Sequence, residues 1–251
     1  MKRFISIMLT IQLCIVSFTA NSESINYYVI AKQAMPFQIT TSDNQHSGIV
    51  SDIIAAIFID NYTINYHTYP FNRMISKLKS GGEKNWVTYG SPNWGSVQAA
   101  NLSDHPIYTV SHSILSNINS NFVYQDLNDI SDKVFVLLHG FDYPTLQPYI
   151  DNGEIQELRV KDYSAAFRIL DKMPQDAVFV EMTSRIKYNI KIQSRDLKQF
   201  KLQDFSALIP SYPIYLAFDP NMDSALQQFI NQQLAVLADK GTLTDIINQY
   251  I

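Results

Sequence analysis

The chain has 251 residues, of which 46% are hydrophobic, 12% aromatic and 17% charged, and its formal net charge is −4. This composition suffices for a packed core and predicts one large domain or two lobes. The negative charge argues against nucleic acid or an anionic membrane surface as a partner.

The first 22 residues have the pattern of a secretory signal peptide. Lys2 and Arg3 precede an uncharged apolar segment at 4–18, and small residues lead to a cleavage site before Glu23. The alternative is an uncleaved N-terminal anchor, but we expect cleavage and export to the periplasm. The mature chain would carry 17 basic and 23 acidic residues, a net charge of −6, and would lack Cys14, the only cysteine. A disulfide framework, a Cys-zinc site and a thiol nucleophile are then excluded.

Strand and helix signals alternate in the first part of the mature chain. No later stretch approaches 18 uncharged apolar residues, so we expect no stable membrane insertion after cleavage. In chain order we expect a strand at 25–31, a helix that Ser51 or Asp52 caps, a strand at 63–70, a helix from about Asn72 that Gly81 ends, and a strand at 86–90. This order is typical of α/β units on a parallel sheet.

A similar rhythm returns after residue 120. We expect a strand at 133–140, a helix that starts near Pro144 with Asp142 as its cap, a helix at 164–173, strands at 176–180 and 213–218, a long helix at 223–241 and a short final helix. Two α/β blocks predict two lobes. Parallel α/β sheets bind ligands beyond the carboxyl ends of their strands, so two facing ends would form a closing cleft.

Five segments in this order resemble the extracytoplasmic solute-binding proteins of family 3, which serve polar amino-acid ABC transporters. They are PF…SGIVSDIIAAI from Pro36, FNRMISKLKSGG at 71–82, NLSDHPIY at 101–108, DKVFVLLHG at 132–140 and the whole of 213–251. The resemblance covers nearly all of the mature chain. It is specific for the fold and says little about the ligand.

The resemblance implies an α/β, two-lobed fold of the type II periplasmic-binding-protein kind. Its sheets are rich in parallel strands and have helices on both faces, and two hinge crossings fall near 108–113 and 207–213. We therefore expect a signal peptide at 1–22, a first lobe formed by 23–110 and 210–251, and a second lobe at 111–209.

Glu181 ends an apolar strand at the position where amino-acid binders of the family carry an aspartate. That aspartate pairs with the α-ammonium of the ligand, so the resemblance implies that Glu181 points into the cleft as an acceptor for a cationic nitrogen. The alternative is a solvated carboxylate at a helix N-terminus, stabilised by the helix dipole.

The arginine with which relatives hold the ligand carboxylate is missing. Its position falls at or near Ser96, and no Lys or Arg occurs between Lys84 and Lys133. Asp142, at the start of a second-lobe helix, would repel an anion. We therefore expect a cationic or neutral ligand. Arg73 is a candidate replacement for the arginine, and its alternative is a surface position.

Aromatic residues complete the predicted ligand site. Phe71 matches a position where relatives stack a ring on the ligand, and Trp94 offers a flat face for a ring, a sugar or a cation. The remaining candidates are Tyr89, Gly90, Ser91, His139 and Tyr143. For the aromatic residues, packing in the core or in a lid is the alternative.

The sequence favours a binding protein over an enzyme. It has no HxxxH, HExxH, GxSxG, GxxxxGK[ST] or GxGxxG pattern, and we expect no metal and no cofactor. The expected protein is a periplasmic monomer that closes on a small molecule and delivers it to an ABC permease. The alternatives are a sensing protein that presents its closed form to a membrane sensor, and a small-acid dehydratase in which Glu181 donates a proton.

Overall fold

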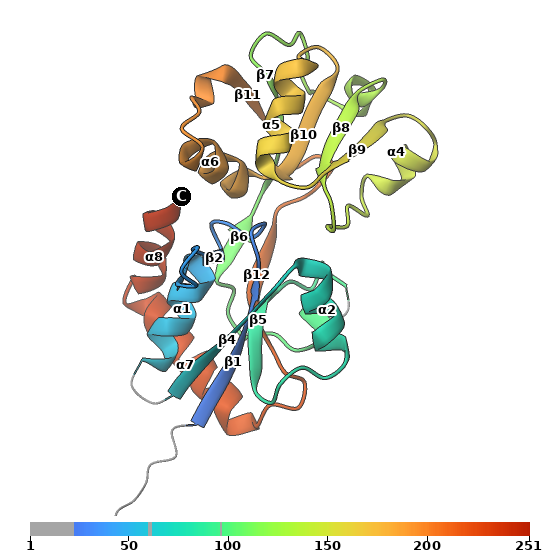
Figure 1. The fold of residues 1–251 in the computed structure, drawn as a ribbon. Helices are drawn as coiled ribbons and strands as arrows, with labels where there is room; N and C mark the ends of the chain where they lie inside the picture. The colour runs from blue at the N-terminus through green and yellow to red at the C-terminus, as the bar shows by residue number, and fades with distance from the viewer. Residues whose placement is uncertain (1–22, 60–61, 96) are drawn as a thin grey trace, which may run out of the picture.

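The computed structural model describes residues 23–59, 62–95 and 97–251, and its chain forms two lobes, one above the other in Figure 1. The predicted signal peptide with Cys14, and the position at Ser96 where relatives carry an arginine, lie outside the described residues. No helix in the described part of the chain is both long enough and apolar enough to cross a membrane.

A five-stranded sheet forms the centre of the first lobe. Its strands, in spatial order, are β4 (Tyr62–Tyr69), β1 (Glu23–Ile30), β5 (Trp86–Gly90), β12 (Tyr212–Phe218) and β6 (Tyr108–Val110). The pairs β1–β4 and β1–β5 are parallel, and β12 runs antiparallel to both of its neighbours. A small hairpin of β2 (Ile39–Thr40) and β3 (His46–Ser47) lies beside this sheet.

The second lobe is built on another five-stranded sheet. Its order is β11 (Phe200–Asp204), β7 (His112–Asn117), β10 (Ala177–Met182), β8 (Val134–Leu138) and β9 (Gln156–Val160). The pairs β8–β9 and β8–β10 are parallel, whereas β7 is antiparallel to β10 and β11. Both sheets are thus mixed, with parallel strands on one side and antiparallel strands where the chain changes lobe.

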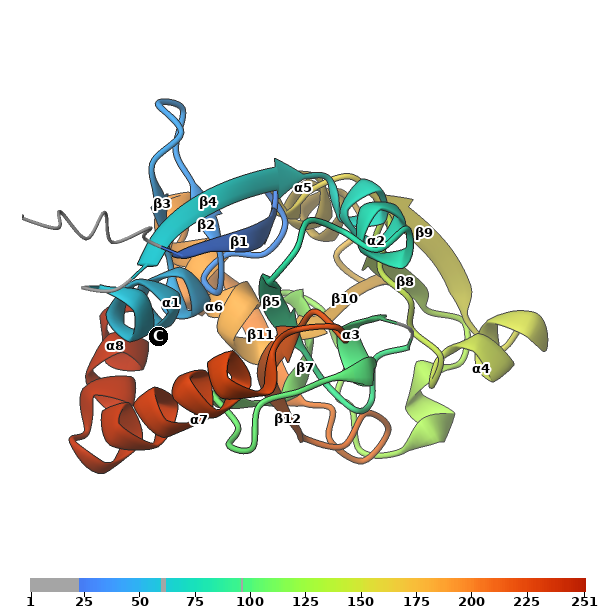
Figure 2. The same cartoon turned by 90° about the horizontal axis from the view of Figure 1, so that it is seen from below.

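Helices flank both sheets (Figure 2). In the first lobe α1 (Ile49–Phe58), α7 (Ser224–Asp239) and α8 (Thr242–Tyr250) pack together, while α2 (Phe71–Lys79) packs on β1 and β4 and contacts α3 (Val97–Ala100). In the second lobe α5 (Tyr163–Lys172) packs on β8 and β10, and α6 (Thr183–Ile192) follows β10 directly. The short elements there are α4 (Gln147–Asp151), η1 (Leu127–Ile130) and η2 (Leu197–Gln199).

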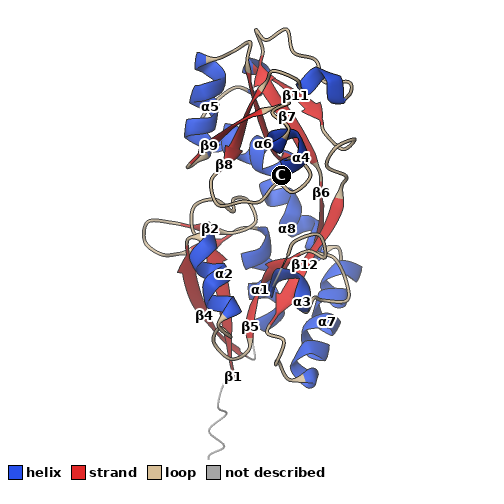
Figure 3. Ribbon diagram, turned by 90° about the vertical axis from the view of Figure 1, so that its right-hand side faces the viewer, coloured by secondary structure: helices blue, strands red, loops and turns tan. Residues whose placement is uncertain are grey.

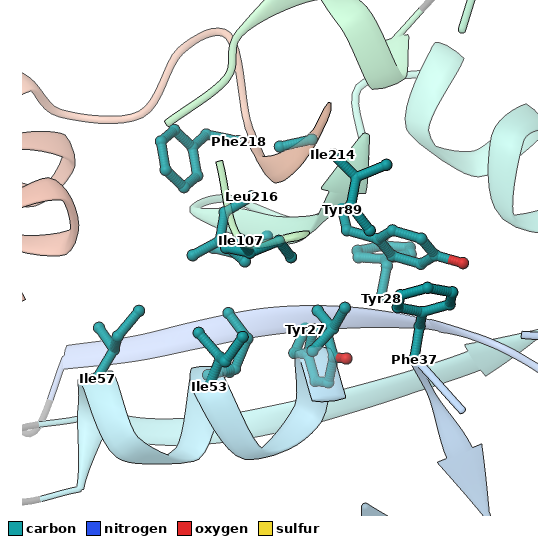
Figure 4. Packing of buried hydrophobic residues seen from close by; sticks show 14 of the residues in the cluster. Tyr27, Tyr28, Phe37, Ile53, Ile57, Tyr89, Ile107, Ile214, Leu216 and Phe218 are labelled. Atoms are coloured by element: carbon teal, nitrogen blue, oxygen red, sulfur yellow. The ribbon is translucent and has the colours of Figure 1, made fainter. Parts of the chain in front are cut away.

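Each lobe has its own hydrophobic core. The core of the first lobe joins side chains of β1, β5, β12 and α1, and Figure 4 shows Tyr27, Tyr28, Ile53 and Leu216 among them. In β8 of the second lobe, Phe135 belongs to one cluster and the next residue, Val136, to another. Successive side chains of a strand point to opposite faces, so β8 is buried on both sides, as its continuous apolar sequence predicts.

The chain passes between the lobes twice: β6 leads toward the second lobe and β12 leads back from it, and Figure 3 shows both strands at the junction of the lobes. β6 pairs in the first sheet and β7, two residues later, pairs in the second; the chain returns between Asp204 and Tyr212. The predicted fold class, a two-lobed α/β structure with two crossings, is confirmed.

Two predicted helix caps are wrong. The first helix begins at Ile49 with Gly48 as its N-cap, so Ser51 and Asp52 lie within its first turn. The helix predicted near Pro144 is α4, which begins at Gln147; Asp142 does not cap it, and Pro148 lies in its first turn. Gly48 has φ +106°, and a Cβ there would lie 2.8 Å from the Phe37 and Pro36 carbonyl oxygens, so glycine is required.

Candidate ligand-binding cleft

A cavity of about 1150 Å³ lies between the two lobes. The first lobe lines it chiefly from α2 and from the loop after β5, and the second lobe lines it from the loop after β8 and from the junction of β10 and α6. Since the lining comes from both lobes, a bound molecule would contact both, which is the arrangement that favours closure on a ligand.

Trp94 is held in the first-lobe wall by two aromatic neighbours. Its indole Nε1 donates a hydrogen bond to the Tyr212 hydroxyl at 3.0 Å, and its ring meets Tyr89 edge-on with centroids 5.5 Å apart. These contacts fix a half-buried indole at the cleft, where it lines the cavity. A ring held in this way can receive a flat or apolar part of a ligand.

Glu181 reaches the cleft because of the strand alternation. Ala177 and Phe179 point from β10 into the core on one face, and Glu181 is the next residue on that face, where the strand reaches α6. Its side chain is almost fully buried, with the residue 3% exposed, and it accepts a hydrogen bond from the Met182 backbone N–H at 2.8 Å.

Arg185 is the ionic partner of Glu181. It lies one helical turn further along, in α6, with a guanidinium nitrogen 3.5 Å from the Glu181 carboxylate, and it is only 2% exposed. A second guanidinium nitrogen donates to the Tyr89 hydroxyl at 3.0 Å across the two lobes. Glu181, which the sequence predicts to bind a cationic ligand, is therefore already paired with a cationic side chain of this protein.

Aromatic rings from both lobes enclose the Arg185 guanidinium. Its central carbon lies 5.7 Å from the ring centroid of Phe37, in the loop after β1, and 5.1 Å from that of Phe141, in the loop after β8. Phe37 and Tyr89 stack with centroids 5.9 Å apart, and Figure 4 shows them side by side at the edge of the first-lobe core. Aromatic faces attract a guanidinium most strongly in such a desolvated place.

Further contacts join the lobes around this cluster. Phe71 at the start of α2 stacks on Phe141 with centroids 4.9 Å apart. Gln33 in the first lobe donates from its side-chain amide to the carbonyl oxygens of His139 and Lys161 in the second, at 3.2 and 3.1 Å. The described conformation is thus one in which the two lobes touch.

Burial changes the acid–base properties of two cleft residues. Burial raises the pKa of the Glu181 carboxyl above its ordinary value, and the charge of Arg185 and the Met182 N–H offset part of that rise. Burial also lowers the pKa of His112 to about 4, with the nearby Arg185 charge acting in the same direction. His112 is therefore neutral at pH 7.

Arg159 lines the second-lobe wall with its charge already engaged. Its guanidinium donates to the backbone carbonyls of Leu138 at 3.0 Å and Phe141 at 2.6 Å, pairs with Glu157, and lies 5.1 Å from the ring centroid of Tyr143. These bonds hold the loop after β8 in place, so Arg159 supports the wall that carries Phe141.

Most of the residues predicted for the site line the cavity. They are Phe71, Tyr89, Trp94, His139, Asp142, Tyr143 and Glu181. Tyr143 and Tyr89 are also buried, as their packing alternative requires, and the Tyr143 hydroxyl accepts from the Leu138 N–H at 3.3 Å.

Three predicted residues do not line the cavity. Arg73 lies exposed on α2 with its guanidinium 5.3 Å from the ring centroid of Tyr69, so the structure places its charge outside the cavity lining. Ser91 is fully buried and donates to the Pro213 carbonyl. A Cβ on Gly90 would lie 1.9 Å from the Gln98 carbonyl oxygen, so this close approach of the backbone requires glycine.

Sequence reasoning missed the cations of the cleft, Lys79, Arg159 and Arg185. For Arg185 a signal was present: it follows Glu181 by four residues, the spacing of an ion pair on a helix, immediately after a strand. A search limited to the family's arginine position, ahead of NLSDHPIY, does not reach it.

A second hollow of about 620 Å³ lies wholly on the first lobe. Its lining residues are Asn44, Gln45, His46, Tyr66 and Thr68. His46 stacks on Tyr66 with centroids 4.2 Å apart, and its Nε2 hydrogen-bonds Thr68 at 2.8 Å, so one nitrogen of the imidazole is engaged within the first lobe. Within the described residues no group of three or more His, Cys, Asp or Glu side chains is placed to hold a metal ion.

Solved structures similar to this chain are two-lobed binding proteins. One is from a study of glutathione import via GshT and the cystine ABC importer TcyBC of Streptococcus mutans, with 19% identity, a TM-score of 0.73, and coverage of 91% of this chain and 95% of that one. Another is an ancestral arginine-binding protein bound to arginine, with 16% identity, a TM-score of 0.72, and coverage of 91% and 98%.

A third similar structure is an ancestral amino acid-binding protein described as a precursor of cyclohexadienyl dehydratase. It has 16% identity and a TM-score of 0.68, and the match covers 90% of this chain and 95% of that one. No protein-family model matches the chain, and no curated protein matches it in sequence. At these identities the comparisons establish the fold, which agrees with the resemblance drawn from the sequence.

Proposed function

We propose that this chain is a periplasmic solute-binding protein that closes on a small polar ligand and delivers it to an ABC permease. The observation that carries the proposal is the cavity of about 1150 Å³ whose lining comes from both lobes. Similarity to binding proteins of ABC importers along nine-tenths of the chain supports it. The predicted signal peptide supports export.

Closure is the physical basis of this function. A ligand shifts the equilibrium between open and closed forms only by its differential affinity for them, and contacts to both lobes exist only in the closed form. Here Trp94 would contribute from the first lobe and His139 from the second, each from a loop next to a strand end. The closed form would then be the one that the permease recognises.

The charges of the cleft favour a neutral or zwitterionic ligand. Its lining contains three cationic side chains, Lys79, Arg159 and Arg185, against the two carboxylates of Asp142 and Glu181. Because Arg185 compensates the charge of Glu181, the expectation of a cationic ligand loses its principal support. A neutral ligand remains consistent with these charges. Specificity would then come from hydrogen bonds and from stacking on Trp94.

A binding role, without turnover, fits the state of Glu181. A dehydratase on this fold would use a cleft carboxyl group as proton donor, but this carboxylate is paired with Arg185 and bonded to the Met182 N–H. We therefore expect no turnover of small carboxylic acids. Turnover that the Glu181→Gln variant abolishes would instead support the enzyme.

A thermal-shift screen of the mature chain against small metabolites tests the proposed function. A ligand at 100 times its dissociation constant adds about 2.7 kcal/mol to the stability of the folded state, which is a readily measured rise in Tm. We expect a rise with a neutral or zwitterionic compound, and a smaller one in the Trp94→Ala variant. A library of transported solutes that leaves Tm unchanged would contradict the proposal.

A further inference from the structure

Four side chains, two from each lobe, surround the guanidinium of Arg185. Phe37 and Tyr89 come from the first lobe, and Phe141 and Glu181 from the second. The guanidinium lies 5.7 and 5.1 Å from the two phenyl centroids, 3.0 Å from the Tyr89 hydroxyl and 3.5 Å from the Glu181 carboxylate. We call these four side chains the guanidinium box.

The guanidinium box has the chemistry of a receptor for an organic cation. Two aromatic faces, a carboxylate and a phenol oxygen are the groups that attract and hydrogen-bond a planar guanidinium. Arg185 is 2% exposed, so its own side chain fills the box and leaves no room for a second cation. The chain makes with its own residue the contacts that a bound alkylguanidinium would make.

The position of Arg185 gives these contacts a consequence for the two lobes. Arg185 belongs to α6 in the second lobe, whereas Phe37 and Tyr89 belong to the first. Its bond to Tyr89 and its contact with Phe37 therefore exist only while the lobes are together, as do the contacts of a ligand in a closed cleft. A ligand normally supplies such bonds between lobes; here a side chain supplies them.

We propose that Arg185 is an internal occupant of the guanidinium box, which holds the lobes together without a ligand and excludes free guanidinium compounds from this part of the cleft. The inference concerns the same cleft and in that sense rests on the proposed function, but its tests need no natural ligand. It makes Arg185 a determinant of both closure and specificity.

The internal contact is incomplete, which allows the lobes to open. The Nε atom of Arg185 is buried and has no hydrogen-bond partner among the described residues. The separation of 3.5 Å from Glu181 is also longer than the 2.7–2.9 Å typical of a strong charge-assisted hydrogen bond. A buried guanidinium that is not fully paired regains hydrogen bonds to water on opening, which offsets part of the lost contact.

Inter-lobe distance measurements test whether Arg185 holds the lobes together. The mature chain lacks cysteine, so Lys77→Cys on α2 and Asn152→Cys after α4 provide two exposed labelling sites, one on each lobe. Fluorescence energy transfer in the ligand-free protein should report a predominantly closed form. Tyr89→Phe removes the hydrogen bond from Arg185 to the Tyr89 hydroxyl and keeps every charge, and it should increase the open fraction at least threefold.

Tyr215→Phe is the matched control, because this tyrosine of the neighbouring strand β12 does not line the cleft. A ligand-free protein that is predominantly open, or an equal distance distribution for Tyr89→Phe and the control, would overturn the proposal. Tyr89→Phe leaves the Glu181–Arg185 pair intact, so this comparison stands even where changes at Arg185 prevent folding.

Titration with methylguanidinium tests the box itself. We expect the folded Arg185→Ala variant to bind methylguanidinium at least tenfold more tightly than the unchanged protein, measured by calorimetry. Adding Glu181→Gln to that variant should abolish the gain, because it removes the carboxylate. Equal affinity in the unchanged protein and in Arg185→Ala would overturn the proposal. A metabolite screen that finds no ligand would count only against the proposed solute binding. The inter-lobe distances and the methylguanidinium titration do not depend on that screen.

Discussion

The two walls of the cleft differ in how they use charge. The first-lobe wall offers aromatic rings, amides and hydroxyls, with Lys79 as its one charged lining residue in the described part of the chain. The second-lobe wall carries Arg159, Arg185, Asp142 and Glu181. Most of the charge of the cleft is thus on the second lobe.

The charged wall is also largely self-neutralised. Arg185 pairs with Glu181, and Arg159 pairs with Glu157 and also donates to backbone carbonyls of its own lobe. Breaking a buried pair is costly because it leaves one charge unpaired in a place that water does not reach. The following variants test this contrast, from the largest expected effect to the smallest.

Glu181→Ala should lower the free energy of unfolding by about 3–5 kcal/mol, because it leaves the Arg185 guanidinium buried without its carboxylate. Asp142→Ala removes an exposed carboxylate from the same wall and should change stability by less than about 0.5 kcal/mol. Urea unfolding measures both. A loss below about 1 kcal/mol for Glu181→Ala would mean that the pair is not a buried ionic unit.

His112 should make the stability of the protein depend on pH. Its pKa is about 4 when folded and 6.5 ordinarily, so below pH 6.5 the unfolded chain binds the proton more readily. Stability should fall as the pH drops from 6.5 to 4, by up to about 3 kcal/mol from this residue. Unfolding curves of His112→Gln should show a smaller loss of stability over this pH range. An equal loss in the variant and the unchanged protein would mean that other groups cause it.

Tyr212→Phe should cost about 1 kcal/mol of stability, because the Trp94 indole N–H loses its acceptor. Thermal unfolding measures the change, and Tyr215→Phe on the same strand should stay within about 0.5 kcal/mol. Equal effects of the two substitutions would show that the bond to Trp94 contributes nothing to the first-lobe wall.

Arg73→Ala should have the smallest effect. The side chain is exposed and lies over Tyr69, away from the cavity lining, so stability should change by less than about 0.5 kcal/mol. Affinity for any ligand found by screening should be unchanged within twofold in a calorimetric titration. A tenfold loss of affinity would return Arg73 to the site.

The sequence predicted the fold more accurately than it predicted the charged residues of the second-lobe wall. Strand and helix periodicity placed the elements that it predicted within a few residues, because local patterns decide them, but it did not predict β7, β9, β11 or α6. The aromatic residues of the first-lobe wall were also predicted. Phe71 lies at the start of α2 and Trp94 lies in the loop after β5, two elements that the sequence pattern predicts. The predicted caps Ser51, Asp52 and Asp142 were wrong because α1 begins after Gly48 and α4 begins after Leu146.

The pairing of Glu181 with Arg185 could not be inferred from the family pattern. In that family, the carboxylate and the arginine contact the ligand from different lobes. In this chain a helix that begins directly after β10 brings an arginine back onto the carboxylate, and its enclosure depends on Phe37, nearly 150 residues away in the sequence. Contacts of this range depend on the assembled lobes.

The central claim, that a ligand binds between two different walls, is tested most directly by one set of titrations. The best compound from the metabolite screen is titrated into the mature protein, into Trp94→Ala on the first-lobe wall and into Thr145→Ala on the second. Binding between the lobes predicts weaker affinity in both variants, with the larger loss at Trp94. Unchanged affinity in both would contradict the claim.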